Sequence, residues 1–253
     1  MISTTDPAGP GHMRLLLAGM SLALAAAALT ACGSDGSTGT GATSTASSEY
    51  AISMLNHRAA GTRVVTYRSF AEAMPNHAYL KRGEPVTISD AVVVGRVVGA
   101  HRGAGFFVPG ESDAPSGTRI DFDDPRAQWK TVHLEVEVHD TIAGRTPGER
   151  IVVGVPLMDM TADFDRLAKS LTSLGEVIAP LKDDSPMYDY DERVHAVAGD
   201  GELLGVLVDG DRIELPFARD ESGDRLAAST PTLGELREAL RRPLTVSAPR
   251  GIE

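Results

Sequence analysis

The hydrophobic residues from position 89 onward follow the periodicities of β-strands. Residues 91–98 form a valine-rich run, which predicts a largely buried strand. Residues 131–140 alternate between apolar and polar side chains, which predicts a strand with one buried face and one solvated face. The apolar positions of that strand are Val132, Leu134, Val136 and Val138, and the polar positions are His133, Glu135, Glu137 and His139.

Further segments of strand character follow at short intervals along the chain. Asp209-Gly210-Asp211 predicts a tight hairpin, because aspartate and glycine tolerate the positive φ angles of such turns. Residues 143–148 indicate another turn, and residues 100–125 indicate a polar loop. The remaining predicted strands are residues 150–155, 176–181, 193–198, 203–208 and 212–217.

Two helices are expected among these strands. Phe164, Leu167 and Leu171 recur at helical spacing, and Gly175 suits the C-terminal end of that helix. A capping box at residues 232–235 predicts the start of the second helix.

Residues 49–85 carry a weaker pattern than the segment that follows them. Residues 64–67 have strand character, and a capping box at residues 69–72 predicts a short helix. We expect these residues to form an N-terminal extension that packs on a globular domain comprising residues 86–253.

The expected fold is mainly β with short helices, in the α+β class. The predicted strands lie too close together in the chain for a helix to connect each pair, so the sheet should be mostly antiparallel. A small barrel or a curved sheet, possibly OB-like, accommodates this order most economically.

Residues 1–31 have the organisation of an export signal. Arg14 precedes an apolar stretch at residues 15–29, which has the length of a signal-peptide core and is too short to cross a bilayer. The stretch ends in Leu29-Thr30-Ala31-Cys32, which resembles the lipobox of bacterial lipoproteins.

The lipobox resemblance implies where in the cell the protein is located. It implies cleavage before Cys32, diacylglycerol and acyl groups such as palmitate on Cys32, and a lipid-anchored protein on the extracytoplasmic face of the cell membrane. The alternative is a plain secretory peptide in which Cys32 is incidental, and either Met1 or Met13 can be the start of translation. Residues 33–48 consist of Gly, Ser, Thr, Ala and Asp, a composition that predicts a flexible tether between the anchor and the domain.

The net charge, the cysteine count and the motifs of the sequence limit which functions are expected. The net charge of −11 repels phosphates, and no Lys/Arg cluster offsets it, so no nucleic-acid partner is expected. Cys32 is the only cysteine, which excludes an intramolecular disulfide. The sequence lacks a Gly-x-Ser-x-Gly elbow, a Walker loop and a His-Glu-x-x-His motif, so enzymatic activity is uncertain and no catalytic residue is predicted.

The polar face of residues 131–140 is the best candidate for chemistry. His133, Glu135, Glu137 and His139 point the same way in a strand, and His and Glu side chains are ligands of Zn²⁺. One straight strand cannot close a compact site, so a neighbouring strand must add a ligand, with His195 the obvious candidate. The alternative is an ordinary solvated strand face.

Other polar residues suggest a calcium site or a ligand contact. The acidic clusters at residues 121–124 and 183–192 have the oxygen ligands that Ca²⁺ prefers, although neither has EF-hand spacing. Polar loops of an acidic protein are the alternative explanation. Trp129 is expected to be a core or edge aromatic residue, with a ligand contact as the alternative.

A second resemblance covers residues 89–242. Four segments are similar to patterns in bacterial surface proteins of unknown function: residues 89–97, 132–138, 148–153 and 201–213. Related patterns occur in the OB-like barrels of metalloproteinase-inhibitor and netrin-like modules. The chain lacks the disulfide cysteines of those modules, so their inhibitory function is not transferred to it.

Two functions remain open on the sequence alone. The first is a lipid-anchored, non-enzymatic module that binds an envelope protein or a small ligand. The alternative is an envelope protein that binds metal through the face of His133, Glu135, Glu137 and His139.

Overall fold

The computed structural model describes residues 41–55, 70–108, 117–157, 159–183, 190–199, 201–218 and 232–247. All of them belong to one compact unit, Gly39–Glu253. The predicted signal at residues 1–31, Cys32, residues 33–40 of the tether and the predicted strand at residues 64–67 lie outside the described residues.

Five strands pair into a closed ring. They are β3 (Ala91–Phe107), β5 (Trp129–Gly144), β6 (Arg150–Leu157), β7 (Glu176–Asp183) and β8 (Val194–Val197). Around the ring, β3 pairs with β5, β5 with β6, β6 with β8, β8 with β7, and β7 with β3. Only the pairing of β6 with β8 is parallel.

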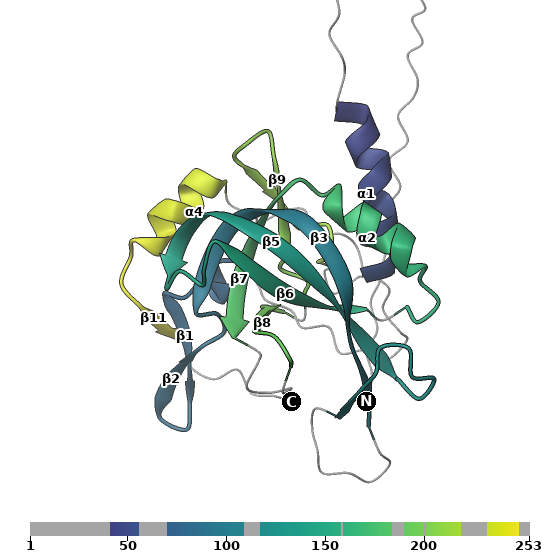
Figure 1. The fold of residues 1–253 in the computed structure, drawn as a ribbon. Helices are drawn as coiled ribbons and strands as arrows, with labels where there is room; N and C mark the ends of the chain where they lie inside the picture. The colour runs from purple at the N-terminus through teal and green to yellow at the C-terminus, as the bar shows by residue number, and fades with distance from the viewer. Residues whose placement is uncertain are drawn as a thin grey trace, which may run out of the picture. The chain divides into compact units, whose positions relative to one another are not determined.

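The connectivity of the ring is that of an OB-like barrel. The ring closes because the first part of the long strand β3 pairs with β7 while most of its length pairs with β5. Helix α2 (Phe164–Thr172) lies in the connection between β6 and β7, and Figure 1 shows the strongly curved sheet beside it. The predicted class, mainly β with a small and mostly antiparallel curved sheet, is confirmed.

Three short strands extend the sheet beyond the ring. Strand β9 (Gly205–Val208) pairs with β7 and with β10 (Arg212–Glu214), and β4 (Thr118–Ile120) pairs with the end of β3. The hairpin between β9 and β10 confirms the predicted turn, since Asp209 and Gly210 have φ angles of 55° and 81°.

The two predicted helices are present. Asp163 caps α2, and its side chain accepts a hydrogen bond from the backbone N–H of Arg166. Helix α4 (Leu233–Leu240) begins with the predicted capping box between Thr232 and Glu235. Each helix buries leucines against the barrel: Leu167, Leu171 and Leu236.

The dry face of the alternating strand forms part of the barrel core. Val132, Leu134 and Val136 are buried, as their alternation predicts. None of the helices in the described ranges has the length and apolarity that crossing a bilayer would require.

The predicted polar loop at residues 100–125 is corrected by the structure. Strand β3 continues to Phe107, and residues 118–120 form β4. Glycines 99, 103 and 105 suggest a loop in the sequence, but in the structure they allow neighbouring groups to approach β3 closely. Trp129 stacks on Phe106 with ring centroids 3.8 Å apart, the packing role that was expected.

The short helix predicted from the capping box at residues 69–72 is present, whereas the small sheet that follows it is not predicted by the sequence pattern. The short helix η1 (Phe70–Ala73) is followed by β1 (His77–Lys81) and β2 (Glu84–Thr87). Strand β1 also pairs with β11 (Thr245–Ser247) at the other end of the chain. These strands are too short and too polar to show a clear periodicity.

The predicted coil at residues 33–48 is corrected for residues 41–48, which belong to α1 (Gly41–Leu55). Packing explains the helix, because its Gly/Ser/Thr-rich first half has a low helix propensity. The backbone N–H of Ala51 donates to Ser170 Oγ at 2.8 Å, and the Tyr50 hydroxyl accepts from the N–H of Asp163 at 2.9 Å. Figure 1 shows α1 beside α2.

Candidate metal-binding site

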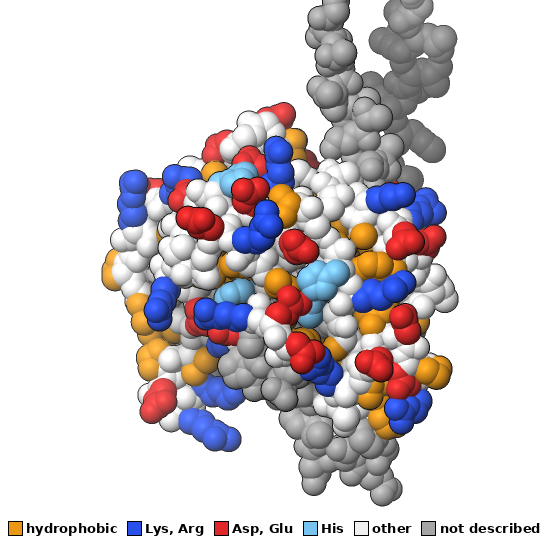
Figure 2. Space-filling model, in the orientation of Figure 1, with side chains coloured by type: hydrophobic (Ala, Val, Ile, Leu, Met, Phe, Trp, Pro, Cys, Tyr) orange, Lys and Arg blue, Asp and Glu red, His pale blue; other side chains and the backbone are white. Residues whose placement is uncertain are grey.

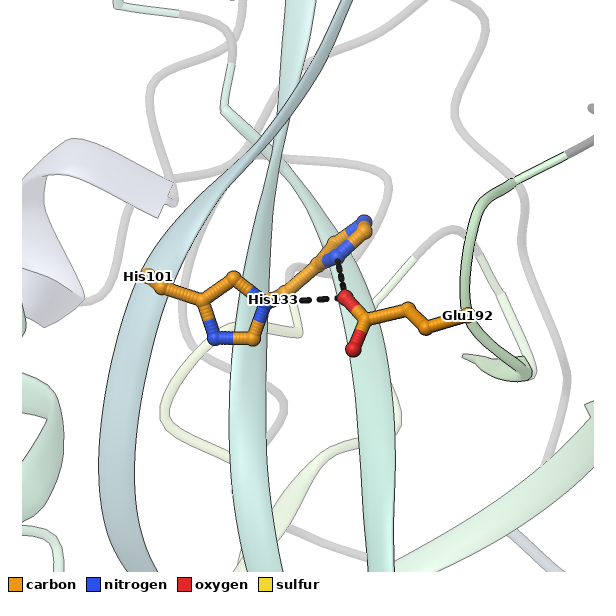
Figure 3. Close-up of side chains that lie close together, drawn as sticks. All are labelled: His101, His133 and Glu192. Carbon is orange, nitrogen blue, oxygen red and sulfur yellow. Dashed lines mark hydrogen bonds and ion pairs between the residues drawn. The ribbon is translucent and has the colours of Figure 1, made fainter.

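Three side chains from separate parts of the chain converge on one carboxylate oxygen. The Nε2 atom of His101 and the Nδ1 atom of His133 each lie 2.8 Å from Oε1 of Glu192. His101 belongs to β3, His133 to β5, and Glu192 to the segment that enters β8. Figure 3 shows the two rings and the carboxylate directed toward one another.

Strand register brings the two histidines together. His101 and His133 are direct partners in the antiparallel pairing of β3 with β5, so their side chains lie on the same face of the sheet. The two rings meet edge to face, with centroids 5.3 Å apart. Because Val132 and Leu134 point into the core, this shared face is the outer face of the barrel.

A glycine beside His133 provides room for its ring. A Cβ atom on Gly103 would lie 2.6 Å from His133 Nε2 and would also collide with Thr131 Oγ1. Thr131 Oγ1 lies 3.5 Å from the same nitrogen and accepts a hydrogen bond from the backbone N–H of Ala104. The ring of His133 is therefore held between the sheet and Glu192.

The segment before β8 covers His133. The Tyr190 ring packs edge to face on the His133 ring at 5.1 Å, and the Arg119 guanidinium lies 5.6 Å from the Tyr190 ring centroid. Arg119 also bonds the carboxylate of Asp191 at 2.6 Å. The side chain of His133 is consequently only 5% exposed, whereas those of His101 and Glu192 are 40% and 41% exposed.

The electrostatics of the cluster suit a metal ion at neutral pH. Burial lowers the pKa of His133 despite the opposing effect of Glu192, so its imidazole is neutral. Burial acts to raise the pKa of Glu192, but the hydrogen bonds from His101 and His133 outweigh it, and the pKa is lowered. A neutral imidazole and a carboxylate are the protonation states that ligate metals.

Two imidazoles and a carboxylate form a known type of transition-metal ligand set. The three ligand atoms lie within 4.8 Å of one another, and His₂Glu is a ligand set of zinc enzymes. Glu135 Oε1 lies 3.7 Å from Nδ1 of His101, on the opposite side of the ring from Glu192. A carboxylate in that position orients a ligating histidine.

The structure separates the four residues proposed from the alternating strand. His133 is in the cluster, though buried rather than solvated because the segment at residues 190–192 covers it. Glu135 lies beside the cluster. His139 pairs instead with Glu176, its Nδ1 3.2 Å from the carboxylate, and Glu137 is exposed. Of the four residues, the structure therefore places only His133 in the group formed with His101 and Glu192.

His195 is not the additional ligand. It is buried at the start of β8, in a cavity that it shares with Asp90 and Asp183. Burial, followed by the charge of Arg193, lowers its pKa. Its neutral ring lines this cavity rather than the cluster.

The sequence pattern does not single out His101 and Glu192 as the residues that lie beside His133. His101 lies in the segment that the glycines mark as a loop, and Glu192 is one of several acids in the second acidic cluster. Only the register of β3 with β5 places His101 opposite His133, and the sequence does not specify that register.

In the acidic clusters, ion pairs with arginine occupy several of the carboxylates that the structure describes. Asp124 bonds Arg126, which holds the pKa of that carboxyl at about 2. Asp183 bonds Arg193 in the same manner. In the described part of the chain, His101, His133 and Glu192 are the only cluster of metal-type side chains. Over the face shown in Figure 2, acidic and basic side chains are interleaved and histidines reach the surface.

Comparison with known proteins gives no relative for this chain. No protein-family model, curated protein or solved structure matches it.

Proposed function

We propose that this protein is a lipid-anchored envelope protein whose OB-like barrel binds a divalent transition metal, with zinc as the reference ion. The observation that carries the metal proposal is the convergence of His101 Nε2, His133 Nδ1 and Glu192 Oε1 from three separate elements. Zinc bound there would take the place of the hydrogen bonds between the two imidazoles and the carboxylate. Its bonds of about 2.0–2.2 Å need the ligand atoms further apart than the 2.8 Å seen here, an adjustment that the partly exposed side chains of His101 and Glu192 can make.

A zinc titration with matched variants tests the site. Zinc at about 100 times its dissociation constant should raise the free energy of unfolding of the chain by about 2.7 kcal/mol, because it binds only the folded state. His101→Ala and Glu192→Gln should abolish this increase. Both side chains are partly exposed, so these variants should still fold.

The control is His139→Ala, which removes another histidine of β5, one that pairs with Glu176 of β7. It should retain the full zinc response. Urea unfolding with and without zinc is the measurement. A zinc response that persists in Glu192→Gln, or disappears in His139→Ala, contradicts the assignment.

The anchor rests on the lipobox and the apolar segment before it. Two acyl chains on one cysteine supply stable membrane attachment, at about 0.8 kcal/mol for each buried CH₂ group, whereas one chain is marginal. Cys32→Ala should therefore move the protein from the membrane fraction to the soluble fraction of its host. Retention of the variant in washed membranes would exclude Cys32 as the anchor.

The second candidate is a non-enzymatic docking module for an envelope protein or small ligand. Arg119 of β4 contacts Tyr190 and Asp191, so the β3–β5 and β7–β8 connections meet over the outer face of the barrel. OB-folds bind ligands between the corresponding loops. The zinc titration separates the candidates, because a barrel that serves only for docking shows no zinc response.

A further inference from the structure

Among the residues that the structure describes, the candidate centre has fewer protein ligands than a closed structural zinc site requires. Structural sites use four protein ligands, whereas catalytic sites use three and leave one position for water or substrate. His101, His133 and Glu192 supply three among the described residues.

Neighbouring polar side chains in the described ranges are directed elsewhere. Glu135 faces Nδ1 of His101, the nitrogen that points away from Glu192. The carboxylate of Asp191 bonds Arg119, and His139 pairs with Glu176. None of these groups is placed as a fourth ligand.

Exposure shows that one side of the centre is open to solvent. His133, at 5% exposure, lies against the sheet and under Tyr190, whereas His101 and Glu192 are 40% and 41% exposed. A metal ion held by these three groups would therefore be accessible to water from the side of His101 and Glu192.

The charge of the centre favours an anion at the remaining coordination position of the metal. Two neutral imidazoles and one carboxylate leave a divalent ion with a net charge of +1. Among the described residues, Glu135 places a further acid beside His101, and the charge of Arg119 is paired with that of Asp191. The attraction for an anion therefore comes chiefly from the metal itself.

We infer that the metal centre of His101, His133 and Glu192 accepts a small anionic oxygen ligand, a carboxylate or a phosphate, directly on the metal. This inference rests on the proposed metal function and extends it from binding a metal ion to binding a second ligand on that ion. It places the centre with exchangeable, catalytic-type sites rather than with structural ones.

Cobalt substitution tests the inference, because the visible absorption of Co²⁺ reports its ligands. The full chain is loaded with Co²⁺ and dialysed, and acetate and inorganic phosphate are then titrated separately. We expect a saturable change in the position and intensity of the visible bands. Cobalt content after a second dialysis should be unchanged, which distinguishes binding of the anion from removal of the metal. His139→Ala is the matched control and should behave as the wild type.

The outcomes distinguish the two proposals. Cobalt that binds but keeps its spectrum in both anions means that the position is closed, which overturns the ligand inference and leaves the metal proposal intact. Absence of any cobalt spectrum overturns both proposals. Loss of cobalt with either anion also overturns the inference, since the anion then competes with the protein instead of joining it.

Discussion

Gly103 illustrates how a residue without functional groups shapes the site. It lies on β3 beside His133, where any Cβ atom would come within 2.6 Å of the Nε2 atom of that ring. The ring cannot retreat freely, since Thr131 and Tyr190 also border it. Glycine at this position is therefore required by the packing of the His133 ring.

Gly103→Ala should weaken zinc binding at least tenfold, because it displaces a ligating ring. Forcing an extra carbon into a packed position also costs typically 1–3 kcal/mol of stability, about the value we expect here. Isothermal titration with zinc and urea unfolding measure the two effects. The matched control is Gly234→Ala in α4, whose new Cβ would lie no closer than 3.8 Å to another group. Wild-type zinc affinity in Gly103→Ala would show that the ring of His133 does not bind the metal.

At the scale of single residues, the sequence predicts which face of a strand a residue occupies but not what covers that face. Alternation correctly assigns Val132 and His133 to opposite faces of β5. It cannot show that residues 190–192 fold over one of those faces, because that cover comes from a distant part of the chain. His133 is therefore buried where a solvated histidine was expected.

At the scale of secondary-structure elements, helix α1 shows the same limit of prediction from the sequence. Its first half has the composition of a linker, and contacts with α2 stabilise the helix. The Arg166 guanidinium lies 4.0 Å from the centre of the Tyr50 ring, and Ala51 is fully buried. Elements with local signals, such as the Asp209-Gly210 turn, could be predicted, whereas α1 depends on its partner.

Ser170→Ala should loosen α1 from the barrel. The variant removes the hydroxyl that accepts from the Ala51 N–H, a buried hydrogen bond for which we expect a loss of about 1 kcal/mol of stability. Limited proteolysis should then cut residues 41–55 faster than in the wild type. Thr172→Ala removes a hydroxyl that bonds only within α2 and serves as the control. Equal cleavage of both variants would show that this hydrogen bond does not hold α1.

At the scale of the molecule, the barrel creates the site by pairing strands that are distant in sequence. The valine run and the alternating strand predict a small, curved, mostly antiparallel sheet. Closure depends on β3 pairing with both β5 and β7, and this pairing also sets His101 opposite His133. Local patterns do not specify that register, which is why the fold class could be predicted and the ligand set could not.

The central claim is that one metal ion binds between His101, His133 and Glu192. Anomalous diffraction at the zinc edge, from a crystal of the zinc-loaded protein, tests it most directly. We predict one strong peak, about 2.0–2.2 Å from His101 Nε2, His133 Nδ1 and a Glu192 carboxylate oxygen. Zinc bound instead at His139 and Glu176, or no ordered zinc on the barrel, would contradict the claim.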